Sequence, residues 1–94
     1  MNKVLSVNDK MYVIMTEDKK CILRGRKNTR LVLSLIDEKD NHKLFTCRQP
    51  SEVVSNLNSD MTRVWLTDNA KKLYSDKKPK LIAVRAYLEY RVEL

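Results

Sequence analysis

Two segments rich in lysine and arginine are the residues best suited to bind a ligand. Between Lys19 and Ile36 the sequence has six basic residues and no acidic one, and a later group of five lysines is interrupted only by Asp76. The two groups are Lys19, Lys20, Arg24, Arg26, Lys27 and Arg30, followed by Lys71, Lys72, Lys77, Lys78 and Lys80. Such groups neutralise phosphates with a salt-dependent affinity, and arginine adds bidentate contacts.

The overall charge agrees with an anionic partner. Nineteen Lys and Arg residues oppose twelve Asp and Glu residues, which gives a formal net charge of +7. Net charge describes nonspecific attraction and solubility rather than fold. The sequence therefore favours a nucleic-acid partner, RNA ahead of DNA, while a basic surface that only keeps the protein soluble stays open.

A third group of possible contacts lies near the C-terminus. Arg85, Tyr87 and Arg91 alternate along the last predicted strand. Aromatic and basic side chains on one sheet face can stack and hold unpaired bases. Glu89 and Glu93 share that predicted face, however, so cross-strand ion pairs explain the pattern equally well.

The sequence does not predict catalytic, metal or cofactor chemistry. His42 is the single histidine and falls in a polar turn, and Gly25 is the single glycine, which excludes a glycine-rich phosphate loop. Cys21 and Cys47 are expected to be small buried residues, because with His42 they are too few for a structural zinc site. We therefore predict no enzyme, no metal and no cofactor. RNA hydrolysis by basic side chains alone, as in a metal-independent ribonuclease toxin, is a third hypothesis.

A single domain over residues 1–94 must position these side chains. Apolar runs at 11–15 and 21–25 flank a short polar segment and predict a β-hairpin. The runs at 31–36 and 43–48 predict a second hairpin around a polar turn.

Helical segments are expected in the second half of the chain. Pro50 and Glu52 suit the first turn of a short helix of about two turns. A strand is predicted over 61–67, and Thr67 or Asp68 is expected to cap a second brief helix over 69–74. Together with the hairpins, this order predicts an α+β fold, with a mainly antiparallel sheet of five to six strands and helices on one face.

The last segment, 81–94, is expected to form one long strand. Its apolar face would comprise Ile82, Val84, Ala86, Leu88, Tyr90, Val92 and Leu94. Trp65 and Phe45 are expected in the core with Tyr90. An unpaired edge of such length predicts a homodimer formed through the 81–94 strand.

The stretch from Tyr12 to Leu57 resembles small accessory proteins of bacteriophages. The resemblance is carried by the strand YVIM, the turn TEDKK, the strand CILRG and the strand and helix LFTCRQPSEVVSNL. It implies a host-takeover or anti-defence factor that acts in the host cytoplasm and engages RNA, DNA or a host protein.

A protein partner is the main alternative to nucleic acid. In that interpretation the chain is an inhibitor or adaptor whose basic surface meets an acidic host protein. No apolar run approaches the roughly 20 residues of a membrane span, and the first residues do not read as a signal peptide. We therefore expect a cytoplasmic protein without a membrane partner.

Overall fold

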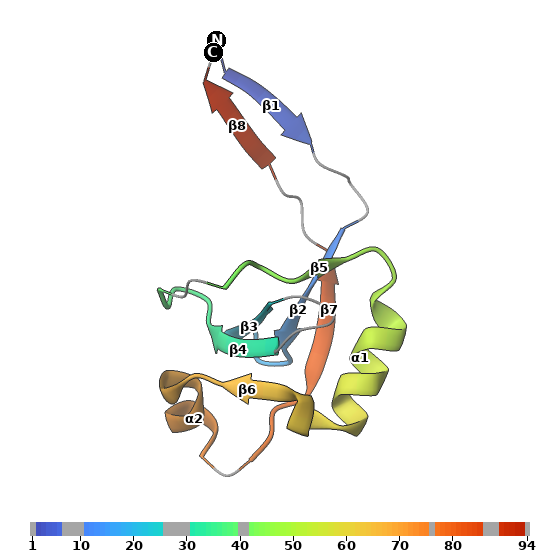
Figure 1. Cartoon of the computed structure of the whole chain (residues 1–94), viewed down its shortest axis with the longest axis vertical. Coiled ribbons are helices and arrows are strands. Elements are labelled where there is room, and N and C mark those ends of the chain that lie inside the picture. Colours follow the sequence, from blue (N-terminus) through green and yellow to red (C-terminus); the bar gives the residue numbers. More distant parts are fainter. Residues whose placement is uncertain are drawn as a thin grey trace.

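The computed structural model describes residues 2–6, 11–25, 31–39, 42–75, 77–85 and 89–93, and for 2–6 and 89–93 it describes the backbone only. The chain forms an α+β fold with a mixed, mostly antiparallel six-stranded sheet and two α-helices (Figure 1). The predicted fold class is confirmed. In the described residues no helix is long and apolar enough to cross a membrane.

The strands of the main sheet come from both halves of the chain. They are β2 (Tyr12–Thr16), β3 (Cys21–Arg24), β4 (Leu31–Leu35), β5 (Thr46–Cys47), β6 (Val64–Leu66) and β7 (Leu81–Arg85). β7, β2, β3 and β4 are neighbours in that order and antiparallel, and β6 adds to β4 in parallel. The β2–β3 hairpin predicted from the sequence is confirmed.

β5 is inserted between β2 and β3 where these two strands move apart. Met15 pairs with Ile22 near the hairpin turn, but farther along Thr46 pairs with Val13 and the isolated bridge partner of Arg24 is Leu44. The predicted hairpin of 31–36 with 43–48 is therefore wrong. β4 already has β3 on one edge and β6 on the other, so the later segment crosses to the gap beside β2.

The helices follow from local sequence signals. Pro50 starts α1 (Pro50–Ser59), where its missing N–H leaves no hydrogen bond unmade, and the helix is longer than the two turns predicted. A 3₁₀ turn, η1 (Met61–Arg63), leads into β6. The Thr67 side chain accepts a hydrogen bond from the Ala70 N–H, 3.3 Å away, and caps α2 (Asp68–Tyr74) as predicted.

Both helices pack on the same face of the sheet and enclose one core. Leu57 of α1 and Ala70 of α2 meet side chains of the four central strands. The fully buried apolar residues of the sheet in this core are Ile14, Cys21, Leu23, Leu33 and Leu81. Phe45 is 5% exposed and joins the same core, as expected.

Trp65 does not enter this core. Its side chain is 54% exposed, so the prediction of a core tryptophan is wrong. Strand alternation gives the reason, because Val64 and Leu66 contribute to the core and the residue between them must face the opposite way. Tyr90, also expected in the core, lies in a strand whose side chains are not described.

The predicted long C-terminal strand is two strands in two sheets. β7 pairs with β2, whereas β8 (Glu89–Glu93) pairs with β1 (Asn2–Ser6) in a separate two-stranded ribbon. Figure 1 shows this ribbon at one end of the molecule. The expected core face is also wrong for β7. Leu81 is fully buried, and Ile82 and Val84 are half-buried on the other face of the sheet.

Candidate anion-binding surface

The two basic segments meet at one end of the main sheet. Thr16, the last residue of β2, pairs with Leu81, the first residue of β7, and the Glu17 N–H donates to the Lys80 carbonyl oxygen at 2.9 Å. The β2–β3 turn, which carries Lys19 and Lys20, therefore runs beside the segment that leads from α2 into β7 (Figure 1).

Tyr74 joins α2 to the same turn. Its hydroxyl donates to the Asp18 carboxylate, with Oη 2.9 and 3.0 Å from the two oxygens, and lies 3.1 Å from Thr16 Oγ1. Burial is the main cause that raises the pKa of Tyr74, and its hydrogen bond to Asp18 acts in the same direction. The hydroxyl thus stays a donor, and the C-terminal end of α2 is held against the turn.

The backbone of the turn is fixed by its own hydrogen bonds. The Lys20 N–H donates to Asp18 Oδ1 at 3.0 Å, and the Lys19 N–H donates to the Thr16 carbonyl oxygen at 2.8 Å. Lys19 has a φ of 61°, in the left-handed region that non-glycine residues seldom adopt. Asp18 therefore orders the loop from which both lysines project.

We call the lysines gathered here the lysine end. All of their side chains are exposed. They are Lys19, Lys20, Lys71, Lys72, Lys77, Lys78 and Lys80. The turn, the short helix and the connection to β7 thus place cations from both sequence segments on one end of the molecule.

Glu17 and Asp18, two described acidic residues of the β2–β3 turn, are engaged in local contacts. Lys80 Nζ lies 3.9 Å from Glu17 Oε2, and both side chains are well exposed. An exposed ion pair of this kind contributes little to the stability of the fold. Burial raises the pKa of Asp18, but hydrogen bonds from Thr16, the Lys20 N–H and Tyr74, with the charge of Lys20, outweigh it and leave the pKa lowered.

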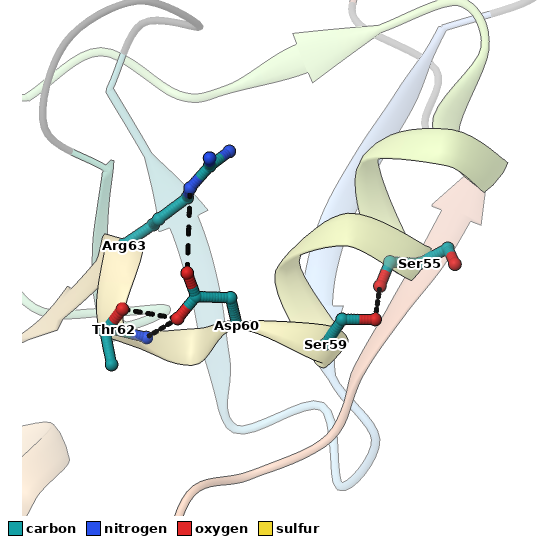
Figure 2. Close-up of polar contacts among 5 residues, drawn as sticks. All are labelled: Ser55, Ser59, Asp60, Thr62 and Arg63. Atoms are coloured by element: carbon teal, nitrogen blue, oxygen red, sulfur yellow. Dashed lines mark hydrogen bonds and ion pairs between the residues drawn. The ribbon is translucent and has the colours of Figure 1, made fainter.

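Asp60 is engaged in the same way at the end of α1 (Figure 2). It accepts hydrogen bonds from the Thr62 N–H, at 3.2 Å, and from the Thr62 hydroxyl, while Arg63 Nε lies 3.9 Å from its other oxygen. These Thr62 hydrogen bonds are the main reason why the pKa of Asp60 is lowered, and the charge of Lys78 acts in the same direction. In the last turn of α1, the Ser59 hydroxyl donates a hydrogen bond to the Ser55 carbonyl oxygen.

A shallow depression of about 540 Å³ separates the end of α1 from residues 78–80. Asn58 bridges its two sides, because its Nδ2 donates to the Leu81 carbonyl oxygen at 2.9 Å and its Oδ1 accepts from the Leu81 N–H at 2.8 Å. Lys78 and Lys80 line the depression. The path of the chain into β7, and so the position of both lysines, is set by this pair of hydrogen bonds.

Other predicted contact residues lie elsewhere. Arg24 sits at the opposite end of β3, where its Nε donates to Ser34 Oγ at 2.9 Å, and Arg85 ends β7 opposite Tyr12. The backbone of Arg91 pairs with Val4 in the ribbon. Arg26, Lys27, Arg30 and Tyr87 lie outside the described residues.

The sequence did not reveal the residues that assemble the lysine end. Asp18 and Tyr74 are 56 positions apart, and neither stands in a recognisable motif. Asn58, in the last turn of α1, stands in no recognisable motif either. Their roles depend on the pairing of β2 with β7, which local patterns do not report.

The remaining reactive side chains form no second cluster in the described residues. Cys21 is fully buried, and burial is the main cause that raises the pKa of its thiol. Cys47 is partly buried against the core. Among the residues of known position, no three His, Cys, Asp or Glu side chains gather as metal ligands. A cavity of about 650 Å³ beside β5 and α1 has mixed charge, from Lys43, Arg48 and Glu52.

Comparison with models of protein families, with curated proteins and with solved structures finds no match to this chain.

Proposed function

We propose that this protein is a non-enzymatic nucleic-acid-binding protein, with RNA preferred over DNA, that holds backbone phosphates through the lysine end. The observation that carries the proposal is the contact between the two basic segments. Tyr74 reaches Asp18, and the Lys80 carbonyl oxygen accepts from the Glu17 N–H, so lysines some 50 positions apart in sequence share one surface.

The chemistry of the lysine end fits phosphate rather than base recognition. Lysine is a flexible point charge with three donors, and it lacks the planar fork with which arginine reads carboxylates, phosphates or guanine. Contacts of this kind position a nucleic acid without reading its sequence. We therefore expect affinity that depends strongly on salt and weakly on sequence.

The proposal is tested by measuring binding to a single-stranded RNA and to DNA of the same sequence across a series of salt concentrations. The decisive variant carries Lys71→Gln, Lys77→Gln and Lys80→Gln. At about 50 mM salt we expect about tenfold or more loss of affinity and a salt dependence shallower by up to about 2, since each phosphate contact on a single strand contributes roughly 0.7 to that slope.

A matched control removes three positive charges elsewhere. Lys43, Arg48 and Arg85 are exposed and lie at the opposite end of the sheet, near Gly25 and Tyr12. The variant Lys43→Gln, Arg48→Gln, Arg85→Gln has the same net charge as the lysine-end variant. It should bind nearly as well as the wild type. Equal losses in the two variants would mean that only the overall charge matters, and undetectable binding at low salt would overturn the proposal.

A protein-binding inhibitor or adaptor is the second candidate. The same exposed lysines suit an acidic protein surface, and complementary charge speeds association with such a partner. A pull-down from a bacterial lysate, with and without nuclease, separates the two, because partners bridged by RNA are lost after nuclease treatment. The role as a phage factor in the host cytoplasm belongs to this proposal. The ribonuclease alternative is tested by incubating the purified protein with RNA in chelator.

A further inference from the structure

The main sheet has a second face, opposite the helices, and it is largely apolar. In β7, Leu81 points into the core between the sheet and the helices. Strand alternation therefore places Ile82 and Val84 on the opposite face. Val13 and Val32 on this side are already buried. We call the apolar side chains of this surface that remain at least partly accessible the open face. They are Met15, Ile22, Ile36, Trp65, Ile82 and Val84.

The register of the strands aligns the central side chains of the open face in one row. Met15 pairs with Ile22 on one side and with Ile82 on the other, so one apolar row crosses β3, β2 and β7. At the β6 end, Trp65 pairs with Val32 of β4. Both α-helices contribute buried residues to the core on the other side, and no described helix packs on this row.

The most accessible large apolar side chains are concentrated here. Among the residues whose side chains are described, three large hydrophobic side chains are exposed, and Trp65, at 54%, and Ile36, at 46%, belong to the open face. The third is Leu73 of α2, at 42%. Ser34, whose hydroxyl accepts a hydrogen bond from an arginine of β3, and the buried Val32 lie between the first two of these side chains and the central row. Exposed apolar side chains gathered on one face mark an interaction surface.

We propose that the open face packs against the open face of a second copy of this chain, which forms a two-fold dimer with the layers helix, sheet, sheet, helix. A sheet whose two faces are both apolar is stable when each face packs against another layer of secondary structure. When that layer is a second sheet, the two sheets lie about 10 Å apart. The contact is isologous, with the same surface used by both copies.

The size of the open face suits a weak dimer. Five strands about 4.8 Å apart, each about five residues of about 3.3 Å, give a footprint of roughly 20 by 16 Å. Two such surfaces bury on the order of 600–1,000 Å² in total, where the upper figure allows for the relief of the side chains. This area lies at or below the lower limit of specific interfaces. We therefore expect a dissociation constant of roughly 1–100 µM.

Charge and side-chain type favour a second copy over a nucleic acid on this face. Bases stack on aromatic rings, and the open face holds one ring among aliphatic side chains. Arg24, which shares this side of the sheet through its pairing with Val32, donates to Ser34 Oγ. The lysine end borders the face at the β2–β3 turn. A two-fold axis perpendicular to the strands places the two lysine ends at opposite ends of the dimer, farther apart than the Debye length of about 8 Å, so we expect that orientation of the axis.

The dimer is tested by sedimentation velocity on the full chain from about 1 to 300 µM. Trp65 is the only tryptophan, so its emission reports directly on the open face. We expect the wild type to shift from monomer to dimer with concentration, and the emission of Trp65 to shift to the blue over the same range. Ile36→Ser should raise the dissociation constant severalfold, because it removes one of the two most exposed apolar side chains of the face.

The control is Leu73→Ser, an equally exposed side chain on α2 outside the face. It should dimerise like the wild type, and circular dichroism checks that both variants fold. Ile82→Lys is a second variant, which places a charge in the central row and should give a monomer.

Three results would overturn the dimer: a wild-type monomer at every concentration, equal effects of Ile36→Ser and Leu73→Ser, or a dimer that survives Ile82→Lys and so uses another surface, such as the edge of β8. A blue shift of Trp65 caused by poly(U) in a monomeric sample would assign the face to nucleic acid instead. None of these variants replaces a lysine of the lysine end, and phosphate binding is measured on the wild type and on the variants described above, so failure here leaves the proposed phosphate contacts to their own test.

Discussion

The Tyr74 hydroxyl lies 2.9 and 3.0 Å from the two carboxylate oxygens of Asp18, across 56 positions of sequence. This contact ties the C-terminal end of α2 to the β2–β3 turn, and with Thr16 Oγ1 at 3.1 Å it closes a small polar network at the edge of the core. The lysine end is held together by this network and by the pairing of β2 with β7.

Tyr74→Phe is expected to lower the free energy of unfolding by about 1–2 kcal/mol, because it removes a hydrogen bond to a charged acceptor. It should also weaken RNA binding modestly, since Lys71 and Lys72 lose their fixed position relative to the turn. Urea unfolding measures the first effect and binding at low salt the second. Tyr12→Phe is the control, and a loss of equal size there would show that the Asp18 contact has no special role.

The network predicts an acid-dependent contribution from Asp18. Its folded-state pKa is lowered below 3.8, so the deprotonated carboxylate stabilises the fold above the unfolded pKa, and this stabilisation is lost as the pH falls through the lowered value. Unfolding measured from pH 7 to pH 2 should show wild type more stable than Asp18→Asn at neutral pH. The difference should shrink below about pH 4. A difference that grows toward low pH would contradict the assignment, and Asp37→Asn serves as the control.

Phe45 belongs to the segment inserted between β2 and β3, and its side chain is buried in the core. Phe45→Ala should cost about 3–5 kcal/mol, the usual range for removing a buried aromatic ring. Small domains have only about 5–15 kcal/mol in total, so this variant is expected to unfold at much lower urea than the wild type. Leu44→Ala, at the partly exposed neighbouring position, should cost less. Similar urea midpoints for the two variants would contradict this role of the Phe45 ring in the core.

Local patterns in the sequence identified most elements but not how they pair. The polar turn between 11–15 and 21–25 predicted its hairpin, and Thr67 predicted the start of α2, because both signals lie within a few residues. Alternation alone misassigned 81–94, since β7 is apolar on both faces and only the pairing of Leu81 with Thr16 shows which face meets the helices. Trp65 was misplaced for the same reason. The lysine end needed Tyr74 and Asp18 to meet, and no local signal reports a contact of that range.

The three neighbours of β2 come from different parts of the chain. β3 follows it directly, whereas β5 comes some 30 residues later and β7 some 70 residues later. The ends of a long loop meet only at an entropic cost, so folding of such a topology is slow compared with a helical protein of equal length. During synthesis on the ribosome, the edge of β2 stays unpaired until residue 85 has emerged. Pairing with β7 is therefore a late step in the folding of the sheet, and it is the step that brings the two lysine-rich segments together.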